Sequence, residues 1–99
     1  MSYRVWIDPS AIAELKTTPG HVRQRLKRAM LAFGSDPRPS DSKELDWPSE
    51  RFEPRRLKLG NWRIVYAVDD NVDWVWVLAV RKRPPYDYGD MSALLQRVG

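Results

Sequence analysis

Basic side chains flank a two-residue turn in the C-terminal half of the sequence. Arg56 and Lys58 precede Gly60-Asn61, and Arg63 follows it closely. Basic and apolar residues alternate on both sides, which indicates a β-hairpin with Gly-Asn as its turn. A two-residue loop places Lys58 directly opposite Arg63, with Arg56 two residues along the same strand face. Like charges in opposite positions destabilise a strand pair, so this arrangement favours a site for an anion; the alternative is a merely solvated surface.

More cations end the next apolar segment, residues 74–80, and two tyrosines follow them. These residues are Arg81, Lys82, Arg83, Tyr86 and Tyr88. If the segment is the strand beside the hairpin, it brings at least one further cation to the same region. Cations bind phosphates and aromatic rings stack on unpaired bases, so this combination suits RNA. Packing against the sheet edge is the alternative for the two tyrosines.

The sequence contains few of the residues that other kinds of catalytic or cofactor site require. His21 is the only histidine, so the chain cannot form a pair of histidines for acid–base catalysis. Cysteine is absent, which excludes disulfides and thiolate metal sites. The acids Asp69, Asp70 and Asp73 lie in an expected turn, where aspartate is common, and no glycine-rich phosphate loop is present. We therefore expect neither a bound metal nor a cofactor.

The basic residues are concentrated in three segments. The net charge is +4, but residues 19–33, 51–63 and 81–83 together carry +11, which leaves −7 for the rest of the chain. Arg23 and Lys27 belong to the first segment, which contains no acid. Such segregation is typical of a surface that meets nucleic acid or an acidic protein. Charges that only keep the protein soluble are the simpler alternative.

Residue periodicity predicts a single α+β domain over residues 1–99, in which helices cover one face of a largely antiparallel sheet. The expected elements are a strand at 3–7, a helix at about 9–17, a helix from Thr18-Pro19 to Gly34, strands at 55–59, 62–68 and 74–80, and a short C-terminal helix from Asp90. Segment 74–80 is apolar throughout, as expected of a strand covered on both faces. Residues 35–50 form a loop, with a short extended piece near Lys43.

Length and hydropathy exclude several protein classes. A chain of 99 residues has room for one small core. No apolar stretch is long enough to span a bilayer, so we expect no membrane partner. The first residues lack a charged leader followed by an apolar run, so we expect no signal peptide and a cytoplasmic location.

Several segments, in order along nearly the whole chain, resemble RelE-type toxins of the RelE/ParE superfamily. They are residues 3–8, 19–28, 36–39, 56–66 and 80–83, followed by Tyr-Asp-Tyr at 86–88. The Arg-Ile-Val-Tyr segment at 63–66, followed by the basic strand end, is the most specific part. The resemblance implies a helical hairpin packed on a twisted antiparallel sheet. It also implies the toxin of a bacterial type II toxin–antitoxin system that cleaves mRNA in the ribosomal A site without a metal.

The resemblance also implies roles for individual residues. The two lysines that the family carries on one strand correspond to Arg56 and Lys58, and the arginine on the next strand corresponds to Arg63. The strand-end arginine corresponds to Arg83, and the site tyrosine corresponds to Tyr88 or Tyr86. Because arginine does not lose its proton in proteins, Lys58 rather than Arg56 is the candidate general base. Arg81, Lys82, Tyr86, Arg23 and Lys27 are expected to contact RNA.

Two other functions remain open at this stage. ParE-like members share the fold but lack the cleaving residues and inhibit DNA gyrase, and a non-catalytic RNA- or ribosome-binding module is the third possibility. The resemblance also implies a cognate antitoxin that wraps the helices and the sheet. The basic helix at 19–33 can face either this antitoxin or ribosomal RNA, and the sequence does not separate the two.

Overall fold

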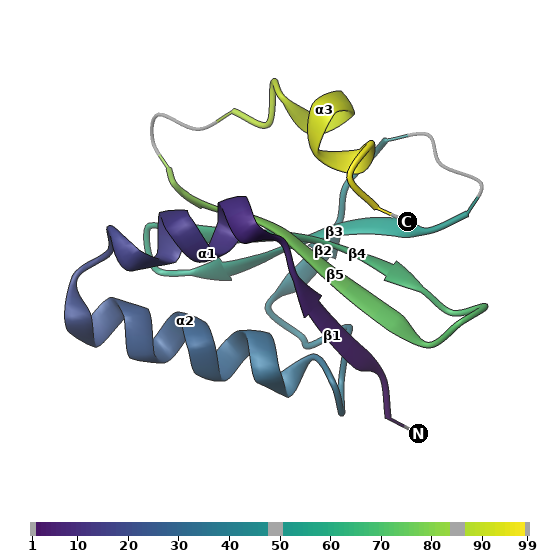
Figure 1. Ribbon diagram of the computed structural model, residues 1–99, viewed down its shortest axis with the longest axis horizontal. Helices are drawn as coiled ribbons and strands as arrows, with labels where there is room; N and C mark the ends of the chain where they lie inside the picture. Colours follow the sequence, from purple (N-terminus) through teal and green to yellow (C-terminus); the bar gives the residue numbers. More distant parts are fainter. Residues whose placement is uncertain (1, 48–50, 84–86, 99) are drawn as a thin grey trace.

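The computed structural model describes residues 2–47, 51–83 and 87–98 (Figure 1). Its elements, in chain order, are β1 (Arg4–Ile7), α1 (Pro9–Lys16), α2 (Gly20–Ala32), β2 (Ser42–Glu44), β3 (Glu53–Leu59), β4 (Trp62–Asp69), β5 (Trp74–Lys82) and α3 (Met91–Leu95). None of the helices within these ranges is both long enough and apolar enough to cross a membrane.

Five strands form one sheet in the order β1-β5-β4-β3-β2. Neighbouring strands are antiparallel except for β1, which pairs with β5 in parallel. The helices α1 and α2 pack on one face, called here the α2 face, and α3 packs on the other, the α3 face (Figure 1). The predicted α+β class is confirmed. Helices α1 and α2 cover one face as predicted, and α3 in addition buries Met91 and Leu94 on the opposite face, which the sequence pattern did not predict.

The register of the β3–β4 hairpin agrees with the prediction from its two-residue loop. Lys58 pairs with Arg63, Leu57 with Ile64, and Arg56 with Val65. Gly60 has a φ of +60°, a left-handed conformation that glycine adopts without steric cost. The turn residues therefore set the side of the sheet on which each basic residue lies.

A bulge interrupts the pairing of β4 with β5. Val65 pairs with Ala79 and Tyr66 pairs with Val77, so Leu78 has no partner in the register. The extra residue places both Leu78 and Ala79 in the apolar cluster of the α3 face. From Ala79 onwards, the alternation of β5 is shifted by one residue relative to its first half.

The first helix begins as predicted, but the start of the second differs. The Asp8 carboxylate accepts a hydrogen bond of 3.0 Å from the Ser10 amide, and Pro9 occupies the first turn of α1. Pro19, rather than Thr18, is the N-cap of α2, and it provides no side-chain cap. The Thr18 hydroxyl instead donates to the Leu15 carbonyl at 2.6 Å, so it closes α1.

The core of the α2 face is organised around two stacked rings. Phe33 and Tyr66 lie with ring centroids 4.0 Å apart and an interplanar angle of 25°. Leu26 and Met30 of α2 belong to the same buried cluster. The Tyr66 hydroxyl donates to the Pro37 carbonyl at 2.8 Å, which ties the segment after α2 to the sheet. Burial raises the pKa of Tyr66, so the hydroxyl stays protonated as a donor.

Replacing Tyr66 with phenylalanine tests this buried hydrogen bond. We expect Tyr66→Phe to lower the free energy of unfolding by about 1–2 kcal/mol, because the Pro37 carbonyl loses its donor inside the protein. The matched control is Tyr3→Phe, which removes an exposed hydroxyl bonded to Asp70 and should change stability by less than about 0.5 kcal/mol. Urea unfolding followed by circular dichroism measures both; equal losses would contradict the assignment.

Candidate functional site

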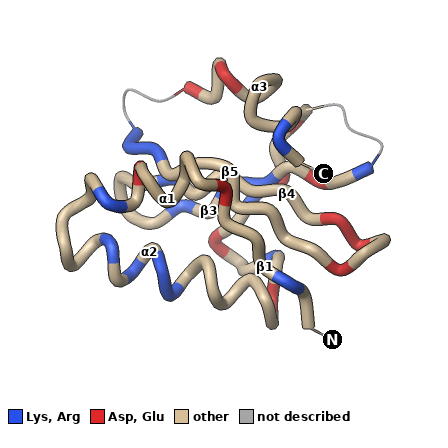
Figure 2. The backbone as a smooth tube through the Cα atoms, in the orientation of Figure 1, with Lys and Arg blue, Asp and Glu red and all other residues tan. Residues whose placement is uncertain are grey.

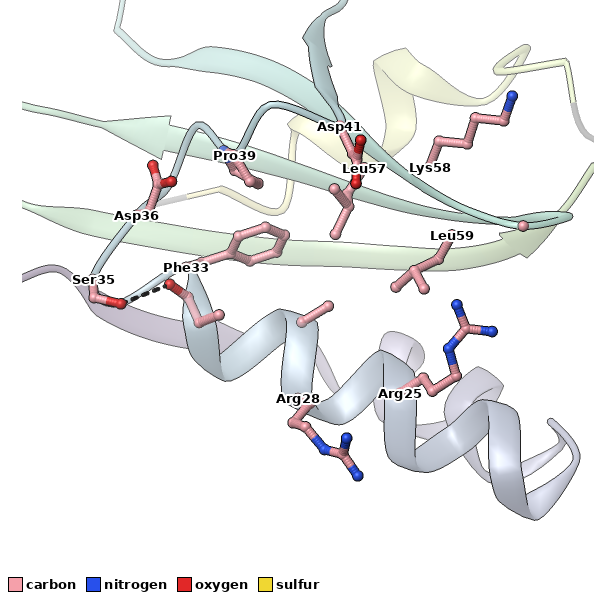
Figure 3. Close-up of a pocket in the computed structure, with 13 residues that line it drawn as sticks. Arg25, Arg28, Phe33, Ser35, Asp36, Pro39, Asp41, Leu57, Lys58 and Leu59 are labelled. Atoms are coloured by element: carbon pink, nitrogen blue, oxygen red, sulfur yellow. Dashed lines mark hydrogen bonds between the residues drawn. The ribbon is translucent and has the colours of Figure 1, made fainter.

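Three cations occupy one row across three adjacent strands. Lys58 on β3 pairs with Arg63 on β4, and Arg63 pairs with Arg81 on β5. Directly paired residues point to the same face of a sheet, and this face is the α3 face. Figure 3 shows Lys58 pointing away from α2, whereas Leu57 and Leu59 point toward it. The predicted grouping of Lys58 with Arg63 is therefore present in the structure.

A neighbouring row adds a lysine that the sequence analysis did not select. Lys43 on β2 pairs with Arg56, and Arg56 pairs with Val65 of the α3 face. Lys43 is exposed, and because β2 is the edge strand, it extends the basic rows to the edge of the sheet. The sequence predicted an extended piece near Lys43, but its pairing with β3 is a long-range contact that no local pattern specifies.

The two arginines beside Lys58 are held by backbone carbonyls. The Arg56 Nη1 atom donates to the Asp41 carbonyl at 3.3 Å. The Arg63 Nη1 atom donates to the carbonyls of Gly60 at 2.9 Å and Trp62 at 3.0 Å. Within the described ranges, neither guanidinium forms an ion pair with a carboxylate. Their positive charge is therefore available to an anion on this face.

Arg83 and Tyr88 complete the arrangement on the α3 face. The Arg83 amide donates to the Asn61 carbonyl at 2.7 Å, which places Arg83 beside the hairpin turn. Its Cζ atom lies 5.7 Å from the centre of the Tyr88 ring, within cation–π range. Tyr88 packs against the apolar cluster of the α3 face and has a φ of +65°. This contact favours Tyr88 as the site tyrosine; Tyr86 lies outside the described residues.

Arg81 differs from the other cations because two carboxylates already hold it. It forms ion pairs with Glu14 and, at 2.8 Å, with Asp90. Partial burial works against the charged form, but the two carboxylates outweigh it and raise the pKa of Arg81. Contact between Arg81 and RNA stays a prediction, but these ion pairs point instead to a role within the protein.

The remaining predicted RNA contacts lie on the other side of the sheet. Lys82 pairs with Trp62, whose side chain packs against the cluster of the α2 face. The Arg23 guanidinium donates to the carbonyls of Lys16 at 3.0 Å and Thr18 at 2.9 Å, so it braces the connection between the two helices. Lys27 is exposed on α2. These three residues do not converge with Lys58, and their contact with RNA stays a prediction.

A groove of about 560 Å³ lies between α2 and β3, and its lining includes Lys58 of the cation row as well as residues of the α2 face. Its apolar lining includes Phe33, Leu57 and Leu59. Figure 3 shows Arg25 and Arg28 along α2, with Asp36 and Asp41 on the other side of the groove. Such a lining fits apolar side chains of a protein segment better than a nucleic acid backbone. The sequence analysis did not find this groove, because it forms between elements distant in the chain.

No group of three or more His, Cys, Asp or Glu side chains that could hold a metal ion occurs among residues 2–47, 51–83 and 87–98. The chemical resources of the α3 face, in the part of the chain described, include two exposed lysines, Lys43 and Lys58, several arginines, and aromatic rings among which Tyr88 lies beside Arg83.

No protein-family model matches the sequence, and a search of curated proteins finds no match. Solved structures do match. A chain in the archaeal RelE–RelB complex from Pyrococcus horikoshii OT3 is 22% identical over 87% of this chain and all of that chain, with a TM-score of 0.77. A double arginine-to-alanine mutant of the Escherichia coli toxin RelE in the free state is 24% identical over the whole of both chains, with a TM-score of 0.70.

A chain in the intact E. coli RelBE toxin–antitoxin complex is 27% identical over 82% of this chain and 96% of that chain, with a TM-score of 0.63. Together these likenesses define the architecture as that of the RelE toxins. The resemblance first seen in the sequence is confirmed for the fold, and the chain has the fold of the RelE toxins.

Two exposed lysines on opposite faces test which surface binds RNA. We expect Lys43→Ala to weaken binding of a single-stranded RNA about three- to tenfold at low salt and to reduce the dependence of affinity on salt, because one phosphate contact is lost. Lys82→Ala removes the same charge from the α2 face and should change the affinity by less than about twofold. Fluorescence anisotropy over a salt series measures the RNA affinity of both variants. A larger loss of affinity in Lys82→Ala than in Lys43→Ala would assign RNA binding to the α2 face.

Proposed function

We propose that this protein is the toxin of a type II toxin–antitoxin system and cleaves mRNA on the ribosome with the cations of the α3 face. The observation that carries the proposal is the grouping of Lys58, Arg63 and Arg83 at one end of that face, with Tyr88 beside Arg83. A phosphodiester placed there meets a candidate base, two guanidinium groups and an aromatic ring.

The proposed reaction uses the 2′-hydroxyl of the RNA as the nucleophile. Lys58, in its neutral form, takes the hydroxyl proton as the 2′-oxygen attacks the neighbouring phosphorus. Arg56 and Arg63 stabilise the additional negative charge on the phosphate oxygens. The bond to the 5′-oxygen breaks, Arg83 stabilises the negative charge on this leaving oxygen, and water supplies the proton that makes it a hydroxyl. The products are a 2′,3′-cyclic phosphate and a 5′-hydroxyl.

The geometry favours Lys58 over its neighbours as the base. Arg56 and Arg63 both donate to backbone carbonyls and keep their protons. Lys58 is exposed, and no carboxylate among the described residues forms an ion pair with it. Its flexible side chain can therefore approach a ribose bound along the row. We expect Tyr88 to stack on a base next to the scissile phosphate, because its ring lies beside Arg83.

An antitoxin is the second expected partner. Solved structures similar to this chain include RelE in complex with the RelB antitoxin. We assign the antitoxin to the α2 face, where the groove between α2 and β3 offers an apolar lining beside Arg25 and Arg28. A segment with apolar side chains and carboxylates at one end complements both features. The basic helix α2 then serves protein recognition, and the α3 face serves RNA.

Gyrase inhibition is the alternative that shares this fold. It does not require Lys58, Arg63 and Arg83 to meet at one phosphate, whereas cleavage does. The structure brings Lys58 and Arg63 together in one register pair and places Arg83 beside the same turn, which supports cleavage over inhibition. Ribosome-dependent mRNA ends indicate an interferase, gyrase-linked DNA breaks indicate the ParE type, and binding without either product indicates a passive module.

Substitution of the proposed base and of the leaving-group residue tests the mechanism. We expect Lys58→Ala to reduce the rate of mRNA cleavage about 100-fold or more, because the 2′-hydroxyl loses its proton acceptor. Arg83→Ala should cost about 100-fold through lost stabilisation of the leaving oxygen. Mapping of mRNA ends on programmed ribosomes measures both rates.

The control for these two variants is Lys16→Ala, which removes an exposed lysine at the end of α1. It should cleave at the rate of the unaltered protein, and circular dichroism should show an intact fold in all three variants. Full cleavage by both Lys58→Ala and Arg83→Ala would defeat the proposed function. Loss of cleavage in Lys16→Ala would show that the assay reports overall positive charge rather than the site.

A further inference from the structure

Arg81 links three elements next to the proposed RNA site. We propose that Arg81 is a positioning residue: its ion pair with Asp90 fixes the segment that holds Tyr88 against Arg83. The inference rests on the proposed cleavage function, because it assigns a purpose to the Arg83–Tyr88 contact. This positioning role explains why carboxylates neutralise Arg81, whereas Lys58 and Arg63 of the same row have no carboxylate partner among the described residues.

The Arg81 side chain is held in place by two carboxylates. Its Nε atom contacts the Glu14 carboxylate from α1, and its Nη1 atom donates to Asp90 at 2.8 Å. Glu14 is anchored in turn, because it accepts a hydrogen bond of 3.2 Å from the Val80 amide. The Arg81 side chain is only 26% exposed, so solvent screens these pairs less than it screens pairs on an open surface. The guanidinium is thus held from two directions.

Asp90, which precedes α3, is one of these two carboxylates. Asp90 is the N-cap residue of α3, but its side chain makes no capping hydrogen bond to the helix. Its carboxylate is directed to Arg81 instead. Helix α3 has only five residues, too few to be stable through its own hydrogen bonds. Its position therefore depends on burial of Met91 and Leu94 and on the Arg81–Asp90 pair.

The Arg81–Asp90 pair lies on either side of two residues of the proposed site in the sequence. Arg81 and Asp90 are nine residues apart in the chain, and both Arg83 and Tyr88 lie between them in sequence. An ion pair between Arg81 and Asp90 restricts how far Arg83 and Tyr88 can move relative to each other. Tyr88 has a φ of +65°, which a tyrosine adopts only where its surroundings impose it. The Arg81–Asp90 pair is a specific interaction that fixes the chain two residues after Tyr88.

Another ion pair provides a matched control. Arg97, which follows α3, pairs with Asp8 at 3.4 Å and so also ties the C-terminal segment to the start of α1. It lies outside the stretch between Arg81 and Asp90. Loss of the Arg97–Asp8 pair loosens the C-terminal segment but leaves the chain near Tyr88 held by Arg81. A variant of Arg97 therefore distinguishes a role in positioning Tyr88 from a general role in attaching α3.

The first test is kinetic. We expect Arg81→Met to lower kcat for mRNA cleavage about tenfold with KM changed less than about twofold, because the residues that act in the transition state are misplaced. Asp90→Asn should give the same loss, and the double variant should lose no more than either single variant, since both act through one pair. Arg97→Met should keep kcat within about twofold of the unaltered protein.

A Tyr88→Ala background tests whether Arg81 acts through the tyrosine. There we expect Arg81→Met to cause no further loss of kcat, because the ring that it positions is gone. Several outcomes would overturn the proposal: an unchanged kcat in Arg81→Met, an equal loss in Arg97→Met, or a full additional loss in the Tyr88→Ala background. The last two would mean that Arg81 acts through overall stability or on the RNA itself.

A measurement without RNA keeps this inference separate from the cleavage proposal. Hydrogen exchange should show faster exchange of amides in residues 87–91 in Arg81→Met than in Arg97→Met, with the β3–β4 hairpin unchanged in both. If the unaltered protein cleaves no mRNA but this difference is present, the proposed function fails and the positioning of the segment stands. If the protein cleaves mRNA but exchange at residues 87–91 is the same in both variants, the positioning role fails alone.

Discussion

The convergence of cations on the α3 face depends on the bulge between β4 and β5. Val75 and Val77 lie in the cluster of the α2 face, so strict alternation would carry Ala79 and Arg81 to that face as well. The bulge leaves Leu78 unpaired and sets Ala79 opposite Val65, which shifts the rest of β5 by one residue. Arg81 thereby pairs with Arg63 on the α3 face.

The parts predicted well from the sequence are those fixed by neighbouring residues. The β3–β4 register follows from a two-residue loop, and the start of α1 follows from the Asp8 cap. The bulge, the pairing of Lys43 with Arg56, and the side on which α3 packs all depend on contacts between distant segments. Periodicity within one segment contains no information about these contacts, so Lys43 was missed and the face on which α3 packs was not predicted.

The charge counted along the chain does not show on which face a cation lies or which groups it contacts. Arg23 and Arg81 belong to basic segments, but each directs its guanidinium to acceptors within the protein. Lys82 lies on the α2 face although its chain neighbours Arg81 and Arg83 lie on the α3 face, because successive residues of a strand alternate between faces. The cations left on the α3 face without a carboxylate partner among the described residues are Lys43, Arg56, Lys58, Arg63 and Arg83.

Three of the acids lie at the far end of the strands from this surface. Asp69, Asp70 and Asp73 lie at the turn between β4 and β5, whereas Arg63 and Arg81 lie at the opposite ends of those strands (Figure 2). Hydrogen bonds from Tyr3 and Arg38 hold the pKa of Asp70 below its ordinary value, and Arg38 and Arg51 form ion pairs with Asp70 and Asp69. The charge of these two acids is therefore balanced within the protein, whereas the cations without a carboxylate partner among the described residues lie toward the Gly60-Asn61 turn, where they attract an approaching polyanion. Glu14 and Asp90 lie beside the cation row, but Arg81 holds both, so they do not compete with a phosphate for Arg56 and Arg63.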